Sequence, residues 1–143
     1  MRLPQLLLFS SCFALFTSCG PNVSGDVDYK QGTPEQCTFS LYSDSVAVHG
    51  EVSGDEDYLV CSDGILTYEG SAGDIVVETG GVATIAGSGV NVYVHSGATI
   101  DISGSVGDVF FEDGATINYH DNEAGDIWLC DELIINKGQA EGC

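Results

Sequence analysis

The sequence predicts an all-β fold, namely a single-domain parallel β-solenoid (β-helix) of about six rungs. Six successive segments can be aligned in register, at spacings of 19, 17, 17, 17 and 18 residues. Within each segment, apolar residues alternate with others at a period of two. A fixed period with such alternation indicates a repeat architecture, because each unit buries its apolar face only against the next. All segments run in the same sense, which favours parallel stacking over the alternative, an antiparallel sandwich.

Each repeat is expected to hold two strands joined by a turn. The six expected first strands are 39–42, 58–61, 75–78, 92–95, 109–112 and 127–130. Their first and third residues are apolar and should point inward. Turns rich in Ser, Asp and Gly follow these strands, where Gly permits the positive φ of a tight corner. A third inward column is expected beyond the turns, at Ala47, Leu66, Ala83, Ile100, Ile117 and Ile135. The handedness of the coil stays open.

The first 18 residues are expected to lie outside this domain. A basic start at Met1-Arg2 precedes an apolar run over 6–16, which is too short to span a bilayer and is typical of a secretory signal. The following segment, 15–20, resembles the lipobox of bacterial lipoproteins, with small residues before Cys19. That resemblance implies cleavage and diacylation at Cys19, and Gly20 after it implies sorting to the outer membrane of a Gram-negative cell. The alternative is an ordinary signal peptide with a chance cysteine.

The expected boundaries follow from the signal and the repeat. We expect a lipoprotein signal peptide over 1–18, a lipid-anchored tether or N-terminal cap over 19–36, the β-solenoid over 37–137 and a C-terminal cap over 138–143.

The charge of the chain restricts its partners. After residue 18 the chain keeps 22 acidic residues against two lysines, Lys30 and Lys137, so its formal charge is −20. Such a field repels phosphate backbones and anionic headgroups, so we expect no nucleic-acid partner and membrane attachment only through the lipid. Solubility outside the cell explains the acidity most simply, and divalent cations are the alternative partner.

Four cysteines remain beyond the signal and the lipid site: Cys37, Cys61, Cys130 and Cys143. An even number in an exported protein predicts two disulfides. Cys61 and Cys130 occupy equivalent positions four rungs apart, roughly 19 Å, whereas a disulfide tolerates about 7 Å between Cα atoms. We therefore predict the pairs Cys37–Cys61 and Cys130–Cys143, each holding a terminal segment to one end of the rod. Metal binding is the alternative, but no CxxC spacing supports it.

An outward aromatic column is the main candidate for a contact face. The middle positions of the first strands end in Tyr93, Phe110 and Trp128, and such rings suit a sugar or a partner protein. The alternatives are ladder stabilisation between rungs and cover by the segment 21–36.

Two ladders are candidates for holding a metal ion. Glu78, His95 and Glu112 follow the aromatic column and could carry a proton or a divalent metal between them. A second ladder at the rung corners could bind calcium, and it consists of Asp74, Asn91, Asp108 and Asp126. The alternative is structural, since such Asx side chains ordinarily hydrogen-bond the backbone of turns. No other cofactor is expected. His49 and His120 lie in different rungs and do not converge.

Gly-Asp-apolar starts at 73–75, 107–109 and 125–127 make residues 38–137 resemble bactofilin-type and adhesin-like β-solenoids in period and composition. We do not transfer the filament function of bactofilins. We expect a lipid-anchored, extracytoplasmic, non-enzymatic binding or structural module of the cell envelope, with a glycan or an envelope protein as partner. The alternatives are an adhesin-like or polysaccharide-binding protein, and a divalent-metal-dependent polysaccharide lyase or hydrolase, which the absence of arginine after residue 18 disfavours. Whether the chain is a monomer or assembles end to end stays open.

Overall fold

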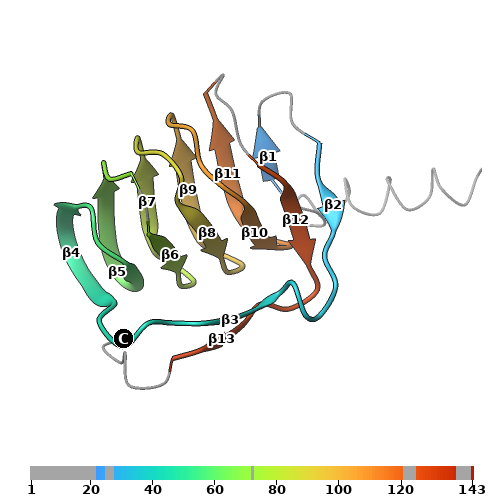
Figure 1. Ribbon diagram of the computed structural model, residues 1–143, viewed down its shortest axis with the longest axis horizontal. Coiled ribbons are helices and arrows are strands. Elements are labelled where there is room, and N and C mark those ends of the chain that lie inside the picture. The colour runs from blue at the N-terminus through green and yellow to red at the C-terminus, as the bar shows by residue number, and fades with distance from the viewer. Residues whose placement is uncertain (1–21, 25–27, 72, 121–124, 138–142) are drawn as a thin grey trace, which may run out of the picture.

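The computed structural model describes residues 22–24, 28–71, 73–120, 125–137 and 143. These residues form thirteen strands and no helix, wound into a single parallel β-solenoid (Figure 1). The predicted fold class is therefore confirmed. Within this part of the chain, no segment forms an apolar helix long enough to cross a membrane.

Two faces of the solenoid are regular β-sheet. The first face is formed by parts of β4 (Val46–Gly54) and β5 (Tyr58–Tyr68), followed by β6 (Asp74–Val77), β8 (Asn91–Val94), β10 (Val109–Glu112) and β12 (Ile127–Cys130). The second face continues β4 and β5 with β7 (Val82–Ile85), β9 (Thr99–Ile102) and β11 (Thr116–Tyr119). Every pairing between neighbouring turns is parallel. The strand order therefore follows the sequence repeat, one turn of chain per strand.

The solenoid has fewer turns than the six rungs expected. Turns of 17, 17, 17 and 18 residues connect five equivalent residues of the first face, Tyr58, Ile75, Val92, Val109 and Ile127. β4 precedes this series with a shorter turn, since Val46 pairs with Tyr58. The difference arises because the segment 39–42, expected to begin the first rung, lies outside the coil.

The core consists of inward columns stacked from turn to turn. The first and third residues of the first-face strands point inward as predicted, and Ile75, Val77, Val92 and Val94 are fully buried. In the predicted third column, Leu66, Ala83, Ile100 and Ile117 are buried, but Ala47 instead pairs with Leu59, on the outer side of the sheet. A fourth inward column was not predicted; it consists of Tyr68, Ile85, Ile102 and Tyr119.

A two-stranded ribbon crosses the outer side of the first face. It pairs β3 (Thr38–Ser40) with β13 (Ile134–Asn136) in parallel, and Figure 1 shows both strands running across the stack. We call these two strands the cover ribbon. Together with Leu41 and Leu133, it packs on a second hydrophobic cluster built on Leu59, Val76, Tyr93 and Phe110. The predicted first-rung residue Phe39 and third-column residue Ile135 both belong to this ribbon.

The N-terminal strands join the far end of the rod. β1 (Asn22–Ser24) pairs with β11, and β2 (Lys30–Gln31) pairs with β12 (Figure 1). Both strands lie within the expected tether or cap over 19–36, and they extend the two faces beyond their last turn.

All four predicted cysteines form disulfides, but the predicted pairing is wrong. Cys37 bonds to Cys130 and Cys61 to Cys143, with Cα–Cα distances of 5.9 and 5.3 Å. The error came from pairing each cysteine with its nearest rung. Because the ribbon runs along the rod, Cys37 lies at the last turn and Cys143 reaches β5 near the first.

Candidate functional site

The aromatic column is mostly covered. Phe39 of the ribbon stacks on Tyr93 with ring centroids 4.2 Å apart, which leaves Tyr93 only 7% exposed. The column continues through Phe110, 5.1 Å from Tyr93, to Trp128, 6.5 Å from Phe110. Phe110 and Trp128 are half-buried, and the Lys30 ammonium lies 5.2 Å from the centre of the Trp128 ring. The expectation of an exposed three-ring face is therefore wrong at Tyr93, because the ribbon covers it.

The acid-histidine-acid ladder forms as predicted, but its atoms do not converge on one point. His95 Nδ1 lies 3.3 Å from Glu112 Oε1, and His95 Nε2 lies 3.7 Å from Glu78 Oε2. The two ring nitrogens thus face carboxylates on opposite sides. A single metal ion bound by one ring nitrogen would not reach both acids.

This ladder instead holds the chain that carries the ribbon. Glu112 accepts hydrogen bonds from the backbone N–H of Leu133, at 2.7 Å, and of Ser96, at 2.8 Å. Glu78 pairs with Lys137 at 2.7 Å, just beyond β13. The carboxylates therefore anchor the two ends of the segment 133–137 to the solenoid.

The ladder at the rung corner connects successive turns. The Asn91 side-chain oxygen accepts the backbone N–H of Asp108 at 2.9 Å, and the Asp108 carboxylate accepts that of Asp126 at 2.8 Å. Asp57 does the same for the N–H of Asp74, at 2.7 Å. These side-chain oxygens accept hydrogen bonds from backbone N–H groups in the next turn of the solenoid. Bonding to backbone is the structural role expected of Asx side chains, and here it connects successive solenoid turns.

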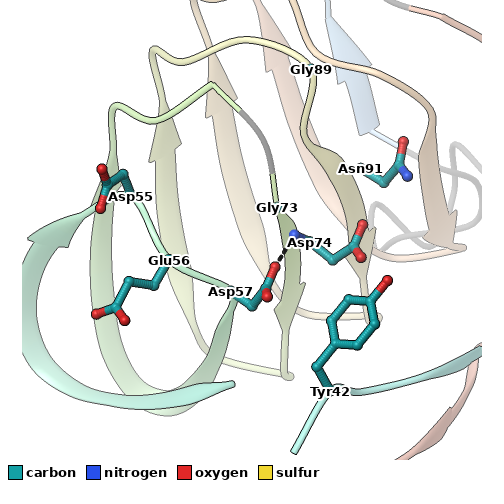
Figure 2. A pocket seen from close by; sticks show the side chains of 8 residues that line it. All are labelled: Tyr42, Asp55, Glu56, Asp57, Gly73, Asp74, Gly89 and Asn91. Atoms are coloured by element: carbon teal, nitrogen blue, oxygen red, sulfur yellow. Dashed lines mark hydrogen bonds between the residues drawn. The ribbon is translucent and has the colours of Figure 1, made fainter. Parts of the chain in front are cut away.

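An open acidic hollow of ≈ 500 Å³ lies where this ladder begins, lined by Tyr42, Asp55, Glu56, Asp57, Gly73, Asp74, Gly89 and Asn91. Figure 2 shows the Tyr42 hydroxyl pointing toward Asp74, with Asp57 to one side and Asn91 beyond Asp74. Tyr42 is 53% exposed, whereas Asp74 is only 8% exposed. We call these eight residues the acidic hollow.

Asp74 is the unusual group of the acidic hollow. Burial, and then the negative charge of Asp57, raise the pKa of the Asp74 carboxyl above its ordinary value, against hydrogen bonds from Asn91 and Tyr42. Burial and the nearby Asp74 also raise the pKa of Tyr93, whose phenol therefore stays neutral. None of the eight lining residues is basic. A cationic or hydrogen-bonding ligand would offset the repulsion between the acids.

No protein-family model matches the chain, and neither a curated protein nor a solved structure matches it.

Part of the acidic hollow was visible in the sequence. Asp74 and Asn91 belong to the predicted ladder, and the run 55–57 is wholly acidic. Tyr42 was placed in a first-rung strand, so its position beside Asp74 was missed. The predicted lipid site, Cys19, lies outside the described residues.

Proposed function

We propose that this chain is a lipid-anchored, extracytoplasmic and non-enzymatic binding module of the cell envelope, and that the acidic hollow binds a glycan. The ligand class is a neutral or amine-bearing sugar. The covered aromatic column then serves to hold the ribbon, and the contact site moves to Tyr42 and its acidic neighbours.

One observation carries the proposal: an exposed aromatic ring stands beside buried and exposed oxygen acceptors. The face of Tyr42 offers a flat apolar surface for the C–H face of a sugar, since aromatic side chains give contact area at little entropic cost. Asp57, Asp74 and Asn91 line the same hollow and carry groups that hydrogen-bond hydroxyls and amines. Such a combination of an apolar surface with a few oriented polar groups is typical of small-ligand sites.

The negative charge of the acidic hollow restricts the class of glycan that it would bind. Four carboxylates, those of Asp55, Glu56, Asp57 and Asp74, line the acidic hollow. Electrostatic complementarity disfavours uronate or sulfate sugars and favours an ammonium group.

The position of the proposed anchor is consistent with this use. Cys19 precedes β1 by three residues, and β1 pairs with β11 near the last turn. The acidic hollow is built around the first turns, on residues that precede β5 and on residues at the starts of β6 and β8. A lipid on Cys19 would thus hold the last-turn end at the membrane, with the acidic hollow facing away. Mass spectrometry of the native N-terminus tests this anchor, and an unmodified N-terminus at residue 19 or 20 would contradict it.

The binding test compares three oligosaccharides of equal length by titration calorimetry: glucosamine, N-acetylglucosamine and galacturonate oligomers. We expect the amine-bearing oligomer to bind most tightly and the galacturonate not at all. Tyr42→Ala should weaken binding about tenfold, since a stacked ring contributes roughly 0.5–1.5 kcal/mol beyond the area that it buries.

Tyr29→Ala is the matched control, because Tyr29 is also exposed but lies outside the acidic hollow. Equal affinity of wild type and Tyr42→Ala, or preference for galacturonate, would contradict the proposal. New reducing ends after prolonged incubation would contradict its non-enzymatic part.

A further inference from the structure

One of the two disulfides has a histidine and an aspartate beside it. His49 Nε2 lies 3.6 Å from Cys61 Sγ, and His49 Nδ1 lies 2.8 Å from Asp63 Oδ1. The three residues come from the paired strands β4 and β5, so the sheet itself places them together. Because Cys61 is bonded to Cys143, its sulfur is not a thiolate that could hold a metal ion in this state.

The two sulfurs of this disulfide are unequal in access. Cys61 is 2% exposed, whereas Cys143 is exposed. Thiol–disulfide exchange requires a thiolate to attack one sulfur and expel the other, and the sulfur that forms the more stable thiolate leaves faster. Attack is therefore directed to Cys143, with Cys61 as the leaving group.

His49 lies where it can stabilise that leaving group. A protonated imidazole next to a cysteine sulfur stabilises the thiolate, which is how reactive cysteines are activated in proteins. Asp63 accepts the Nδ1 hydrogen, which orients the ring and stabilises its charged form. The arrangement therefore favours departure of Cys61.

We propose that Cys61–Cys143 is a thiol-exchangeable disulfide, opened by a low-molecular-weight thiol and assisted by His49. The thiolate forms a bond to Cys143 Sγ, the Cys61–Cys143 bond breaks, and its electron pair leaves on Cys61 as a thiolate facing His49. A second thiol then attacks the mixed disulfide, which releases an oxidised thiol dimer and a Cys143 thiol. The balance is two electrons and two protons gained by the protein and two thiols oxidised to one disulfide.

The other disulfide, Cys37–Cys130, has neither an exposed sulfur nor a neighbouring histidine among the described residues. Cys37 and Cys130 are 2% and 0% exposed. The remaining described histidines pair elsewhere, His95 with Glu78 and Glu112, and His120 with Asp101. Opening by thiols should thus release Cys143 from β5 and leave Cys37–Cys130 intact.

The test treats the native full-length protein with reduced glutathione at pH 7, stops the exchange with an alkylating reagent at set times, and maps each cysteine by mass spectrometry. We expect alkylated Cys61, with glutathione on Cys143, before any modification of Cys37 or Cys130. His49→Gln should slow this opening about 3- to 10-fold, through loss of leaving-group stabilisation.

His120→Gln is the matched control, because His120 is exposed and pairs with Asp101 at 2.7 Å, far from the disulfide in the sheet order. It should open at the wild-type rate. The greater exposure of Cys143 to the thiol could by itself make Cys61–Cys143 open first. The role of the imidazole is therefore tested by comparing the opening rate of His49→Gln with that of wild type. A wild-type rate for His49→Gln, glutathione on Cys61, or earlier opening of Cys37–Cys130 would each overturn the proposal.

Discussion

The buried carboxyl of Asp74 links the stability of the fold to pH. Burial first, and the charge of Asp57 second, raise the pKa of Asp74 in the folded state above the ordinary value of an aspartate. The folded chain therefore holds this proton more tightly than the unfolded chain does. By linkage, the stabilisation associated with the proton is fully present below the unfolded pKa and is lost as pH rises through the folded pKa.

We predict that Asp74→Asn stabilises the protein at pH 7, because it removes a buried charge and keeps an oxygen that accepts hydrogen bonds. The gain should disappear at about pH 2, which lies well below the pKa of Asp74 in both the unfolded and the folded state, so that its carboxyl is neutral in both. Thermal unfolding at the two pH values measures this. Asp113→Asn, at an exposed site, is the control and should change little. A lower midpoint for Asp74→Asn at pH 7 would show that its charge stabilises the fold.

The sequence identified Asp74 as part of a ladder but not as a buried acid. Its neighbours Asp57 and Tyr42 come from the preceding turn and from the segment after β3. Burial of a polar residue depends on such packing between distant segments, which an alternating pattern does not encode.

The cover ribbon is held on the solenoid by carboxylates as well as by apolar contacts. Glu112 accepts two backbone N–H groups, and hydrogen bonds to a charged acceptor contribute more than neutral ones. Loss of this acceptor leaves the N–H of Leu133 without its partner at the point where the chain turns toward β13.

We predict that Glu112→Ala lowers the free energy of unfolding by about 2–4 kcal/mol, measured by urea denaturation. Asp113→Ala, one residue further and exposed, should stay within about 0.5 kcal/mol of wild type. Equal stability of the two variants would mean that Glu112 does not hold the ribbon.

The ribbon also explains the errors made from the sequence. Phe39 and Leu41 alternate with the polar residues Thr38 and Ser40 just as solenoid strands do. A period-two pattern therefore does not distinguish a rung from a strand that crosses its outer face. The paired residues Ile134 and Thr38 lie 96 positions apart in the sequence, so their pairing leaves no local signal. The disulfide pairing was missed for the same reason. By contrast, the fourth inward column was detectable, because Tyr68, Ile85, Ile102 and Tyr119 recur every 17 residues.

At the scale of the whole molecule, the two disulfides connect opposite ends of the rod to the covering segments. The bonds Cys37–Cys130 and Cys61–Cys143 close loops with sequence separations of 93 and 82 residues. Crosslinks that close long loops restrict the unfolded chain strongly, so each should stabilise the fold.

We predict that the double variant Cys37→Ser, Cys130→Ser loses about 2–4 kcal/mol of unfolding free energy in guanidinium denaturation. Cys61→Ser, Cys143→Ser should lose a similar amount, since the loop lengths are close. If neither double variant differs from wild type, the crosslinks do not limit the unfolded chain.

The fold class itself was predictable, because a period of about 17 residues repeats through four turns and agrees with the alternation inside each strand. The structure at the two ends of the solenoid was not predictable from the repeat, because the segments that complete those ends do not repeat.

The partnership of β1 with β11 has a consequence for the order of folding. Asn22 pairs with Thr116, so β1 finds its partner strand only after 94 further residues have been synthesised. Until then β1 has no strand to pair with, while the turns that follow it in the chain assemble. A nascent chain shorter than about 116 residues lacks that partner, whatever the stability of the turns already formed. β1 therefore joins the solenoid only after its repeating turns up to β11 have been made.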